Sequence, residues 1–375
     1  MAIQICQNCV MDTTDPRIEF DEDGICDNCN NYQRYVKPHH LKNIHDDTFR
    51  PVAKKIIGEG KGKEFDCILG MSGGLDSSYL LHKVVTQYNL RPLVFHVDAG
   101  WNSDIAVGNI KKLTSGLKLD LYTEVINWPE MRSLQLAFFK SGVPHIDVPQ
   151  DHAFISVLYH YASKYKIKYI LNGGNFSTEG IRNPLSWLYF GSDKKQLLDI
   201  NSKFGSRKLE HYPVTNVLWH KFYLPYAKGI KVIKPLNCIE YKKNDAEKEL
   251  FDAYGWERYQ QKHFESRFTR FFEGYWLIER FGYDTRKPQF SSLIVSGQMT
   301  RDEALQELLT KPLSDDMIRE EFEYIADKLG IFVPELQNYL VAPHKNYRDY
   351  SNMDWVYDVG SSVMTKLGLE RSAKR

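Results

Sequence analysis

The stretch from Phe65 to Ser78 constrains this chain more than any other. It begins as a short apolar run and continues, over residues 72–78, as Ser-Gly-Gly-Leu-Asp-Ser-Ser. Apolar residues then return at helical spacing between Leu80 and Tyr88. The sequence therefore predicts a buried strand, a glycine-rich turn and a helix that starts at the turn.

A turn of this kind suits phosphate, because it leaves consecutive backbone N–H groups unpaired at the positive end of the helix dipole. Gly73 and Gly74 let a phosphate approach without a Cβ in the way. Ser72 and Ser77 add hydroxyl donors, and Asp76 can hold a Mg²⁺ that bridges phosphates. We predict that all five residues bind ATP and that Ser72 and Asp76 are also catalytic.

The loop lacks the Gly-Lys-Ser/Thr ending of a Walker A motif and the Gly-x-Gly-x-x-Gly of a Rossmann fingerprint. Ser-Gly-Gly-x-Asp-Ser after a strand instead resembles the PP-loop of the ATP pyrophosphatases. The resemblance implies that ATP is split into AMP and pyrophosphate while a carbonyl is activated as its adenylate. The alternative is an ordinary serine-capped helix after a glycine turn, and the strand and amphipathic helix on either side argue against it.

Strand and helix patterns alternate from residue 65 to residue 240, which predicts a doubly wound parallel sheet. We expect this sheet to be of the PP-loop ATP pyrophosphatase (HUP-like) type. The second strand, residues 93–97, ends at Asp98. Because the carboxyl ends of parallel strands face the ligand crevice, we expect Asp98 to meet the nucleotide and Trp101 to flank its base.

A later strand, residues 168–171, runs into a second glycine-rich turn over residues 172–180. The turn carries many polar groups at the same predicted sheet edge, so we expect Gly173 and Asn175 to bind ATP. A solvated loop remains the alternative.

The amino terminus contains two Cys-x-x-Cys pairs, Cys6 with Cys9 and Cys26 with Cys29, separated by sixteen residues. This spacing is typical of a four-cysteine zinc ribbon, with a small hairpin turning at residues 21–24. An iron-sulfur cluster and a redox dithiol remain alternatives to zinc, because the spacing of two Cys-x-x-Cys pairs alone excludes neither.

The chain is long enough for several units. We expect a zinc ribbon over residues 1–35, a connector over 36–62, a PP-loop ATP-binding α/β domain over 63–240, and a helical C-terminal subdomain for substrate or partner over 241–375. The connector should hold one short helix near residues 51–57. For the three histidines of the connector we expect solvated side chains rather than metal ligands; they are His39, His40 and His45.

No apolar run approaches the roughly 18 residues that span a bilayer, and the amino terminus lacks the pattern of a signal peptide. We therefore expect a cytoplasmic protein that is not inserted in a membrane. The formal net charge of +1 is too small to attract nucleic acid through an overall electrostatic field.

Beyond residue 242 the pattern turns helical, and one predicted helix, residues 263–281, mixes polar groups with many aromatic residues. Polar side chains gathered on one face there indicate an anionic ligand, and a buried, internally satisfied network is an equal alternative. The predicted substrate-binding residues are His263, Glu265, Ser266, Arg270 and Arg286.

Taken together, several segments resemble the N-acetyl sugar amidotransferase family of WbpG and PseA type. They are Cys6–Pro16, Gly24–Cys29, the PP-loop, Lys262–Arg270 and Ser291–Gln298. The family implies a role in lipopolysaccharide O-antigen or related bacterial surface-glycan biosynthesis, with ATP, Mg²⁺ and Zn²⁺. An N-acetyl group on a sugar, free or nucleotide-linked, would become an acetamidino group through an O-adenylyl intermediate and ammonia.

Ammonia needs a source. The sequence does not start with Met-Cys and shows no convincing Cys-His-Glu glutaminase module, since Cys67 sits in a predicted strand and Cys238 is solitary. We expect a separate HisH-like glutaminase, with a HisF-like subunit, as the family implies. The runner-up function is a PP-loop tRNA thiolase, which usually needs more cysteines in this domain. A non-catalytic scaffold with a decayed loop is disfavoured by the intact loop residues.

Overall fold

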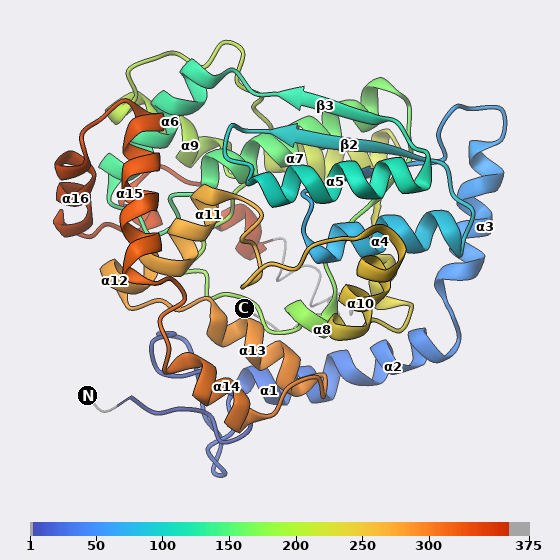
Figure 1. Cartoon of the computed structure of the whole chain (residues 1–375), viewed down its shortest axis with the longest axis horizontal. Coiled ribbons are helices and arrows are strands. Elements are labelled where there is room, and N and C mark those ends of the chain that lie inside the picture. Colours follow the sequence, from blue (N-terminus) through green and yellow to red (C-terminus); the bar gives the residue numbers. More distant parts are fainter. Residues whose placement is uncertain (1–2, 360–375) are drawn as a thin grey trace.

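A computed structural model describes residues 3–359 of the chain, so the predicted C-terminal subdomain is described except for residues 360–375. At its centre lies a parallel sheet of five strands in the order β3-β2-β1-β4-β5 (Figure 1). The strands are β1 (Cys67–Gly70), β2 (Pro92–Asp98), β3 (Leu121–Val125), β4 (Tyr169–Leu171) and β5 (Lys231–Ile233). The predicted doubly wound α/β fold is confirmed.

Both faces of the sheet are covered, as the continuous apolar character of its central strands requires. Ile68 of β1 packs into one core, while its neighbour Leu69 packs into the other. The helices that follow the strands are α4 (Leu75–Thr86), α5 (Asp104–Leu117), α6 (Trp128–Ser141), α7 (Val148–Lys164), α8 (Phe176–Glu179) and α9 (Lys194–Phe204). Helix α4 packs against α5 and α10, whereas α7 packs against β1 and β2 from the other side.

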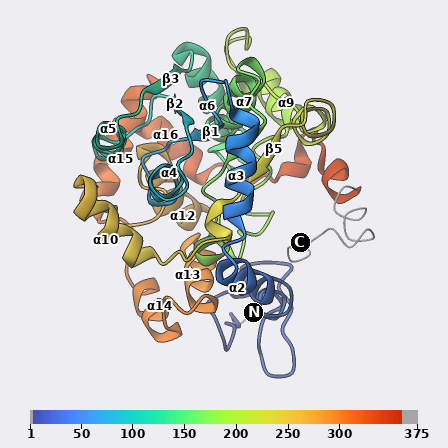
Figure 2. The ribbon, with the colours of Figure 1, turned by 90° about the vertical axis from the view of Figure 1, so that its right-hand side faces the viewer.

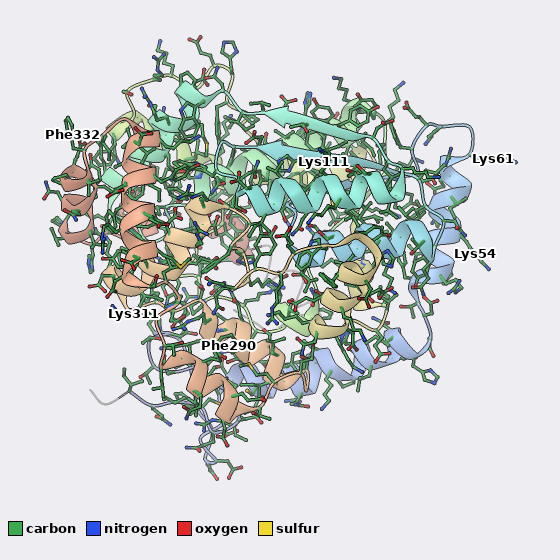
Figure 3. All side chains as sticks on the ribbon, in the orientation of Figure 1. Lys54, Lys61, Lys111, Phe290, Lys311 and Phe332 are labelled. Carbon is green, nitrogen blue, oxygen red and sulfur yellow. The ribbon has the colours of Figure 1, made fainter. Side chains whose placement is uncertain are left out.

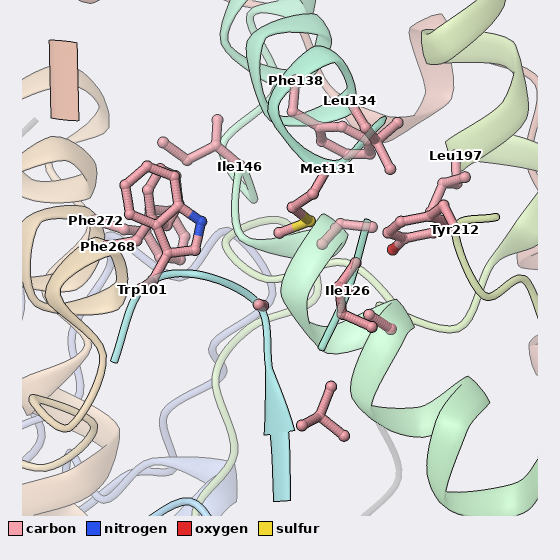
Figure 4. Close-up of a cluster of buried hydrophobic side chains, with 14 of the residues drawn as sticks. Trp101, Ile126, Met131, Leu134, Phe138, Ile146, Leu197, Tyr212, Phe268 and Phe272 are labelled. Atoms are coloured by element: carbon pink, nitrogen blue, oxygen red, sulfur yellow. The ribbon is translucent and has the colours of Figure 1, made fainter. Parts of the chain in front are cut away.

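The larger core joins the sheet to the C-terminal helices (Figure 4). Trp101, at the end of β2, is only 1% exposed. Its ring centroid lies 5.0 Å from that of Phe268 and 5.2 Å from that of Trp128. The expectation that Trp101 flanks a nucleotide base is therefore wrong, because the indole is already packed on all sides.

The amino-terminal segment forms a small cysteine-containing unit followed by helices (Figure 2). An antiparallel bridge between Phe20 and Cys26 closes the predicted turn, where Gly24 adopts a φ of 72°. A helical run then passes through α1 (Asp27–Asn31), a π-helical turn (Tyr32–Val36) and α2 (Lys37–His45), and α3 (Phe49–Gly60) follows.

The connector prediction is therefore wrong in part, because residues 36–62 are mostly helical rather than holding one short helix. His40 is also buried rather than solvated. Its ring nitrogens contact Asn237 O at 3.2 Å and Ser177 Oγ at 3.3 Å. His39 and His45 are exposed, as expected.

The C-terminal subdomain is helical, as predicted. Its helices are α10 (Lys243–Tyr254), α11 (Arg267–Phe271), α12 (Leu277–Phe281), α13 (Arg286–Val295), α14 (Arg301–Leu308), α15 (Asp315–Leu329) and α16 (Val333–Val341), with a π-helical turn (Phe272–Trp276) joining α11 to α12. One boundary differs from the prediction: the helix expected from His263 begins at Arg267. The reason is local, since Ser266 caps α11 and His263 takes a left-handed φ of 66°.

Charged side chains cover the outer surface. Four lysines labelled in Figure 3 are exposed: Lys54 on α3, Lys61 just after α3, Lys111 on α5 and Lys311 before α15. Among residues 3–359, no helix has both the length and the apolar character needed to cross a bilayer.

Candidate functional site

The glycine-rich loop joins β1 to α4 with the geometry that the sequence predicts. Strand β1 ends at Gly70 and α4 begins at Leu75. Gly73 has a φ of 83°, and a Cβ built on it would lie 2.7 Å from the carbonyl oxygen of Ala106. Both the backbone angle and the neighbouring chain thus require glycine at this position.

The two loop hydroxyls hold the turn in shape. Ser72 Oγ lies 3.3 Å from Ser77 Oγ and accepts a hydrogen bond from the Gly74 N–H at 3.2 Å. Ser77 Oγ in turn donates to Gly74 O at 3.1 Å. The loop lines a cavity of about 390 Å³, which we call the loop cavity.

The second glycine-rich turn meets the first at Asp76. Asn175 Nδ2 donates to Asp76 Oδ1 at 3.2 Å, and the hydroxyl of Tyr241 donates to the same oxygen. A Cβ on Gly173 would lie 3.1 Å from the carbonyl carbon of Asp76. The expectation that the two turns share one sheet edge is confirmed, and Gly173 also lines the loop cavity.

Lys262 holds the other oxygen of Asp76. Its Nζ lies 2.9 Å from Asp76 Oδ2, 2.8 Å from Glu179 Oε1 and 3.0 Å from Thr178 Oγ1. Burial alone would lower the pKa of Lys262, but the two carboxylates outweigh it and raise that pKa. Lys262 is therefore a fixed positive charge beside the phosphate-binding loop.

The segment before α11 reaches directly into the loop. Ser72 Oγ donates to Glu265 Oε1 at 3.1 Å, and a Cβ on Gly74 would lie 2.6 Å from that same carboxylate oxygen. The side chain of Glu265 thus lies against the face of the loop that a phosphate would approach. The C-terminal subdomain contributes to the site as much as the sheet does.

His263 is the next ionisable residue of the site, and it pairs with Glu273. Its Nδ1 lies 3.1 Å from Glu273 Oε1. Burial works to lower the pKa of His263, yet the charge of Glu273 raises it to about 9. The imidazole is therefore protonated at neutral pH.

Two further cavities adjoin the loop cavity, and His263 lines all three. The β2-side cavity, of about 440 Å³, lies at the carboxyl ends of β1 and β2 and is lined by apolar side chains such as Phe95, Val97 and Leu158 together with many polar ones. The β5-side cavity, of about 390 Å³, is lined by Arg182 and by Lys234.

One wall of the β2-side cavity carries a buried acid, Asp147. Burial and the charge of Asp151 raise the pKa of Asp147 to about 8. Thr269 Oγ1 donates to Asp147 Oδ2 at 2.7 Å. Ser266 also lines this cavity and donates to Gln150 Oε1 at 3.3 Å.

Of the predicted nucleotide- and substrate-binding residues, four line none of the three cavities: Gly73, Asp98, Arg270 and Arg286. Asp98 Oδ1 accepts from the Gly100 N–H at 2.8 Å and closes the turn after β2. Arg270 pairs with the buried carboxylate of Glu321.

Arg286 forms a buried pair with Asp284 at 2.6 Å and donates to two backbone carbonyls near the end of α14. The structure therefore brings His263, Glu265 and Ser266 together, but it keeps Arg270 and Arg286 within the helical subdomain.

Lys262, Glu179 and Tyr241 are among the cavity-lining residues that the sequence did not predict. Lys262 and Glu179 belong to segments that were singled out, so their charge was an available signal. Tyr241 follows a strand without any pattern of its own, and only the fold brings its hydroxyl to Asp76.

Carboxylates of Asp76, Glu179 and Glu265 face the loop cavity. Carboxylate oxygens are the ligands that Mg²⁺ takes in proteins, together with the phosphates of a substrate. The donor set therefore fits a magnesium nucleotide, although Asp76 is bonded to Lys262 in this structure.

The four predicted zinc ligands meet at one point. The Sγ atoms of Cys6, Cys9, Cys26 and Cys29 all lie within 4.8 Å of one another, and all four residues are buried. Tetrahedral zinc with Zn–S bonds of about 2.3 Å needs sulfurs roughly 3.8 Å apart. The observed pairs at 3.6 and 4.0 Å fit that geometry.

The cysteine unit is attached to the C-terminal subdomain. Arg301 Nε donates to the carbonyl oxygens of Cys6 at 3.0 Å and Cys9 at 3.1 Å. Lys287 pairs with Asp12 at 2.6 Å. The unit thus braces helices α13 and α14, and Phe290 of α13, labelled in Figure 3, lines the loop cavity.

Comparisons with known proteins agree with the C-terminal assignment. Residues 265–364 match the family model described as LPS biosynthesis protein WbpG-like, C-terminal domain. A comparison with curated protein sequences finds no match.

Among solved structures, the chain is similar to NMN synthetase from Francisella tularensis, with 15% identity, 82% of this chain and 97% of that chain covered, and a TM-score of 0.32. It is similar to the NH3-dependent NAD synthetase from Campylobacter jejuni subsp. jejuni with 13% identity, the same coverage and a TM-score of 0.32. Likeness at this level carries no argument, and the fold is established by the chain's own sheet.

Proposed function

We propose, from the match of residues 265–364 to the WbpG-like C-terminal domain model, that the chain is an ATP-dependent amidotransferase. It would convert an N-acetyl group of a nucleotide-linked bacterial sugar to an acetamidino group, with release of AMP and pyrophosphate. The observation that carries the proposal is the hydrogen bond that Ser72 of the phosphate-binding loop donates to Glu265, the first residue of that domain match.

The loop supports binding of the two outer phosphates of ATP. Its glycines place no Cβ beside the start of α4, and the dipole of that helix favours negative charge there. Lys262 supplies a further positive charge at the same place. Bound Mg²⁺ would neutralise phosphate charge beside the carboxylates of Asp76, Glu179 and Glu265.

We assign the base and ribose to the β2-side cavity rather than to the β5-side cavity. Phe95, Val97 and Leu158 give the β2-side cavity an apolar wall, and His96 and Asn102 are among the polar side chains that line the rest of it. A purine needs an apolar slot with a few polar groups that fix its orientation. The β5-side cavity is then left for the acceptor.

In the reaction, the amide oxygen of the acceptor attacks the α-phosphorus of ATP, and the bond to pyrophosphate breaks. The product is an O-adenylyl imidate. Ammonia then adds to the imidate carbon, and the C–O bond breaks so that AMP leaves with the former amide oxygen. Positioning and stabilisation of phosphate charge account for this chemistry, so no nucleophilic side chain is required.

His263 and Lys262 are suited to the first step. Both carry positive charge and line the boundary between the loop cavity and the β5-side cavity. Negative charge develops there as pyrophosphate departs. A protonated His263 would stabilise that charge without giving up its proton.

We further propose that a separate HisH-like glutaminase, with a HisF-like subunit, supplies the ammonia. Of the two cysteines outside the metal-binding unit, Cys67 is fully buried in β1, and neither Cys67 nor Cys238 lines the three cavities. Burial also raises the pKa of the Cys67 thiol, which makes it a poor nucleophile.

The same placement disfavours a tRNA thiolase. Such an enzyme would need a reactive cysteine near the loop, and the described part of the chain places none in the three cavities. The formal net charge of the chain is also only +1, which gives little overall attraction for tRNA.

The proposal is tested by incubating the protein with ATP, Mg²⁺, an ammonium salt and a panel of diacetamido sugar nucleotides. AMP should accumulate in step with a product in which one oxygen is replaced by NH, as measured by mass spectrometry. Stimulation of AMP formation by tRNA rather than by an acetamido sugar would favour the thiolase instead.

A further inference from the structure

The β5-side cavity holds a cluster of cations. Lys234 directly follows β5, and Arg182 lies shortly after α8, so both stand at the carboxyl edge of the sheet. Lys221, on the π-helical segment Trp219–Ala227, lies near enough for its charge to act on Lys234. All three side chains are exposed, and Arg182 and Lys234 line the β5-side cavity.

These cations have no anionic partner within the described residues. Among residues 3–359, no carboxylate lies within ion-pair distance of Arg182, Lys221 or Lys234. The nearest candidates on the cavity wall are already engaged. Glu179 is bonded to Lys262 at 2.8 Å, and Asp151 lies 3.4 Å from His145.

Like charges placed close together oppose one another. Burial, followed by the charge of Arg182, lowers the pKa of Lys221. Burial also lowers the pKa of Lys234; the charge of Glu179 acts to raise that pKa, whereas Arg182 and Lys221 lower it further. Such an arrangement is costly unless an anion enters and compensates the charge.

Lys234 also reaches the neighbouring loop cavity. Gly174 lines that cavity, and a Cβ on it would lie 3.1 Å from Lys234 Nζ and 3.2 Å from Glu179 Oε2. Lys234 therefore stands between the two cavities, near the carboxylate of Glu179.

We propose that the β5-side cavity binds the diphosphate of the nucleotide-linked acceptor through Arg182 and Lys234, with Lys221 beside them. The assignment rests on the proposed function for the identity of the acceptor. Three cations match a group with more than one negative charge better than a single carboxylate does. Because Thr178, Lys262 and His263 line both this cavity and the loop cavity, the acceptor's amide would lie at their boundary.

The binding site is tested without turnover, using inorganic pyrophosphate as the probe. The full-length protein is first saturated with α,β-methylene ATP, which fills the loop cavity, and is then titrated calorimetrically with pyrophosphate. One pyrophosphate should bind to the wild type. Arg182→Gln and Lys234→Met should each weaken binding by about tenfold or more, since one charge-assisted contact is lost.

Lys231→Met is the matched control, because Lys231 is an exposed lysine three residues before Lys234 that lines none of the three cavities. It should bind pyrophosphate as the wild type does. Circular dichroism and the urea midpoint establish that each variant is folded. No binding to the nucleotide-loaded wild type, or equal binding by all three variants, would overturn the assignment.

A kinetic measurement separates this inference from the proposed function. With an acetamido sugar nucleotide, Arg182→Gln and Lys234→Met should raise KM for the acceptor by about tenfold or more and leave KM for ATP unchanged. An equal rise in both KM values would contradict the assignment. If no acetamido sugar yields AMP, the proposed function fails, while the pyrophosphate titration still decides whether the cavity binds a diphosphate.

Discussion

Replacing Gly73 with alanine should damage nucleotide binding more than it damages the fold. Gly73 has a φ of 83°, and the new Cβ would lie 2.7 Å from Ala106 O, 3.1 Å from its Cα and 3.2 Å from its carbonyl carbon. These are backbone atoms of α5, so they cannot turn aside as a flexible side chain would. The loop itself must shift, and its N–H groups shift with it.

A second glycine separates the cost of the backbone angle from the cost of the collision. Gly62 has a φ of 79°, and a Cβ there meets nothing within 4 Å. Gly62→Ala should therefore lose only the left-handed strain, about 1–2 kcal/mol of unfolding free energy. Gly73→Ala should lose a further 1–3 kcal/mol, roughly the cost of overpacking.

Displacement of even one loop amide should weaken ATP binding by about tenfold to a hundredfold, because a hydrogen bond to a charged group contributes roughly 1.5–3 kcal/mol. Urea unfolding followed by tryptophan fluorescence gives the stability of both variants, and calorimetric titration with α,β-methylene ATP gives the affinity. Equal stability losses in the two variants, with wild-type nucleotide affinity in Gly73→Ala, would refute the role assigned to the loop.

Other perturbations probe the rest of the site. Lys262→Met leaves Asp76 and a second carboxylate without their cation, so unfolding free energy should fall by up to about 3 kcal/mol in urea titrations, and AMP formation should fall with it, whereas Lys262→Arg should retain part of both. His263 gains stability from its carboxylate partner because its pKa is about 9 in the folded protein and near 6.5 when unfolded. This contribution is complete below pH 6.5 and is lost as the pH rises through 9. The side chain is 37% exposed, so solvent screening reduces the contribution to about 1 kcal/mol. Urea titrations at pH 6 and pH 10 should thus show a smaller pH difference in His263→Gln, and an unchanged difference would contradict the pairing. Cys26→Ser should abolish binding of zinc, measured by metal analysis, and should lower the melting temperature. An unaltered zinc content would exclude the four-cysteine site.

Much of the site could be predicted because its signals are local. The strand, loop and helix around residues 65–86 follow one another without a break, so hydrophobic periodicity and glycine placement sufficed. The spacing of Thr300 and Glu303 is typical of a capping box, and the structure forms one at the start of α14. The spacing of the two Cys-x-x-Cys pairs predicts that their four sulfurs come together, as they do in the structure.

The parts that failed depend on contacts distant in the sequence. Arg270 was expected to face a ligand, but it pairs with Glu321, which lies 51 residues away. No local pattern shows which carboxylate a cation will find. The prediction that Trp101 flanks the nucleotide base was wrong for a related reason, since the helix that buries Trp101 begins at Arg267, far along the sequence.

The break before α11 had a local cause that the helical pattern concealed. Aromatic spacing suggested one helix from His263, but Ser266 is a good helix cap and starts the helix later. The residues before it are then free of the helix. This is how His263 and Glu265 reach the loop from a different subdomain.

The central claim is that ATP is cleaved between its α- and β-phosphates while an acetamido group is activated. The most direct measurement follows α-³²P-labelled ATP in the presence of ammonium salt and a diacetamido sugar nucleotide, with the products separated by chromatography. The account predicts labelled AMP in a one-to-one ratio with the amidine product. Labelled ADP, or AMP formed at the same rate without any sugar, would contradict it.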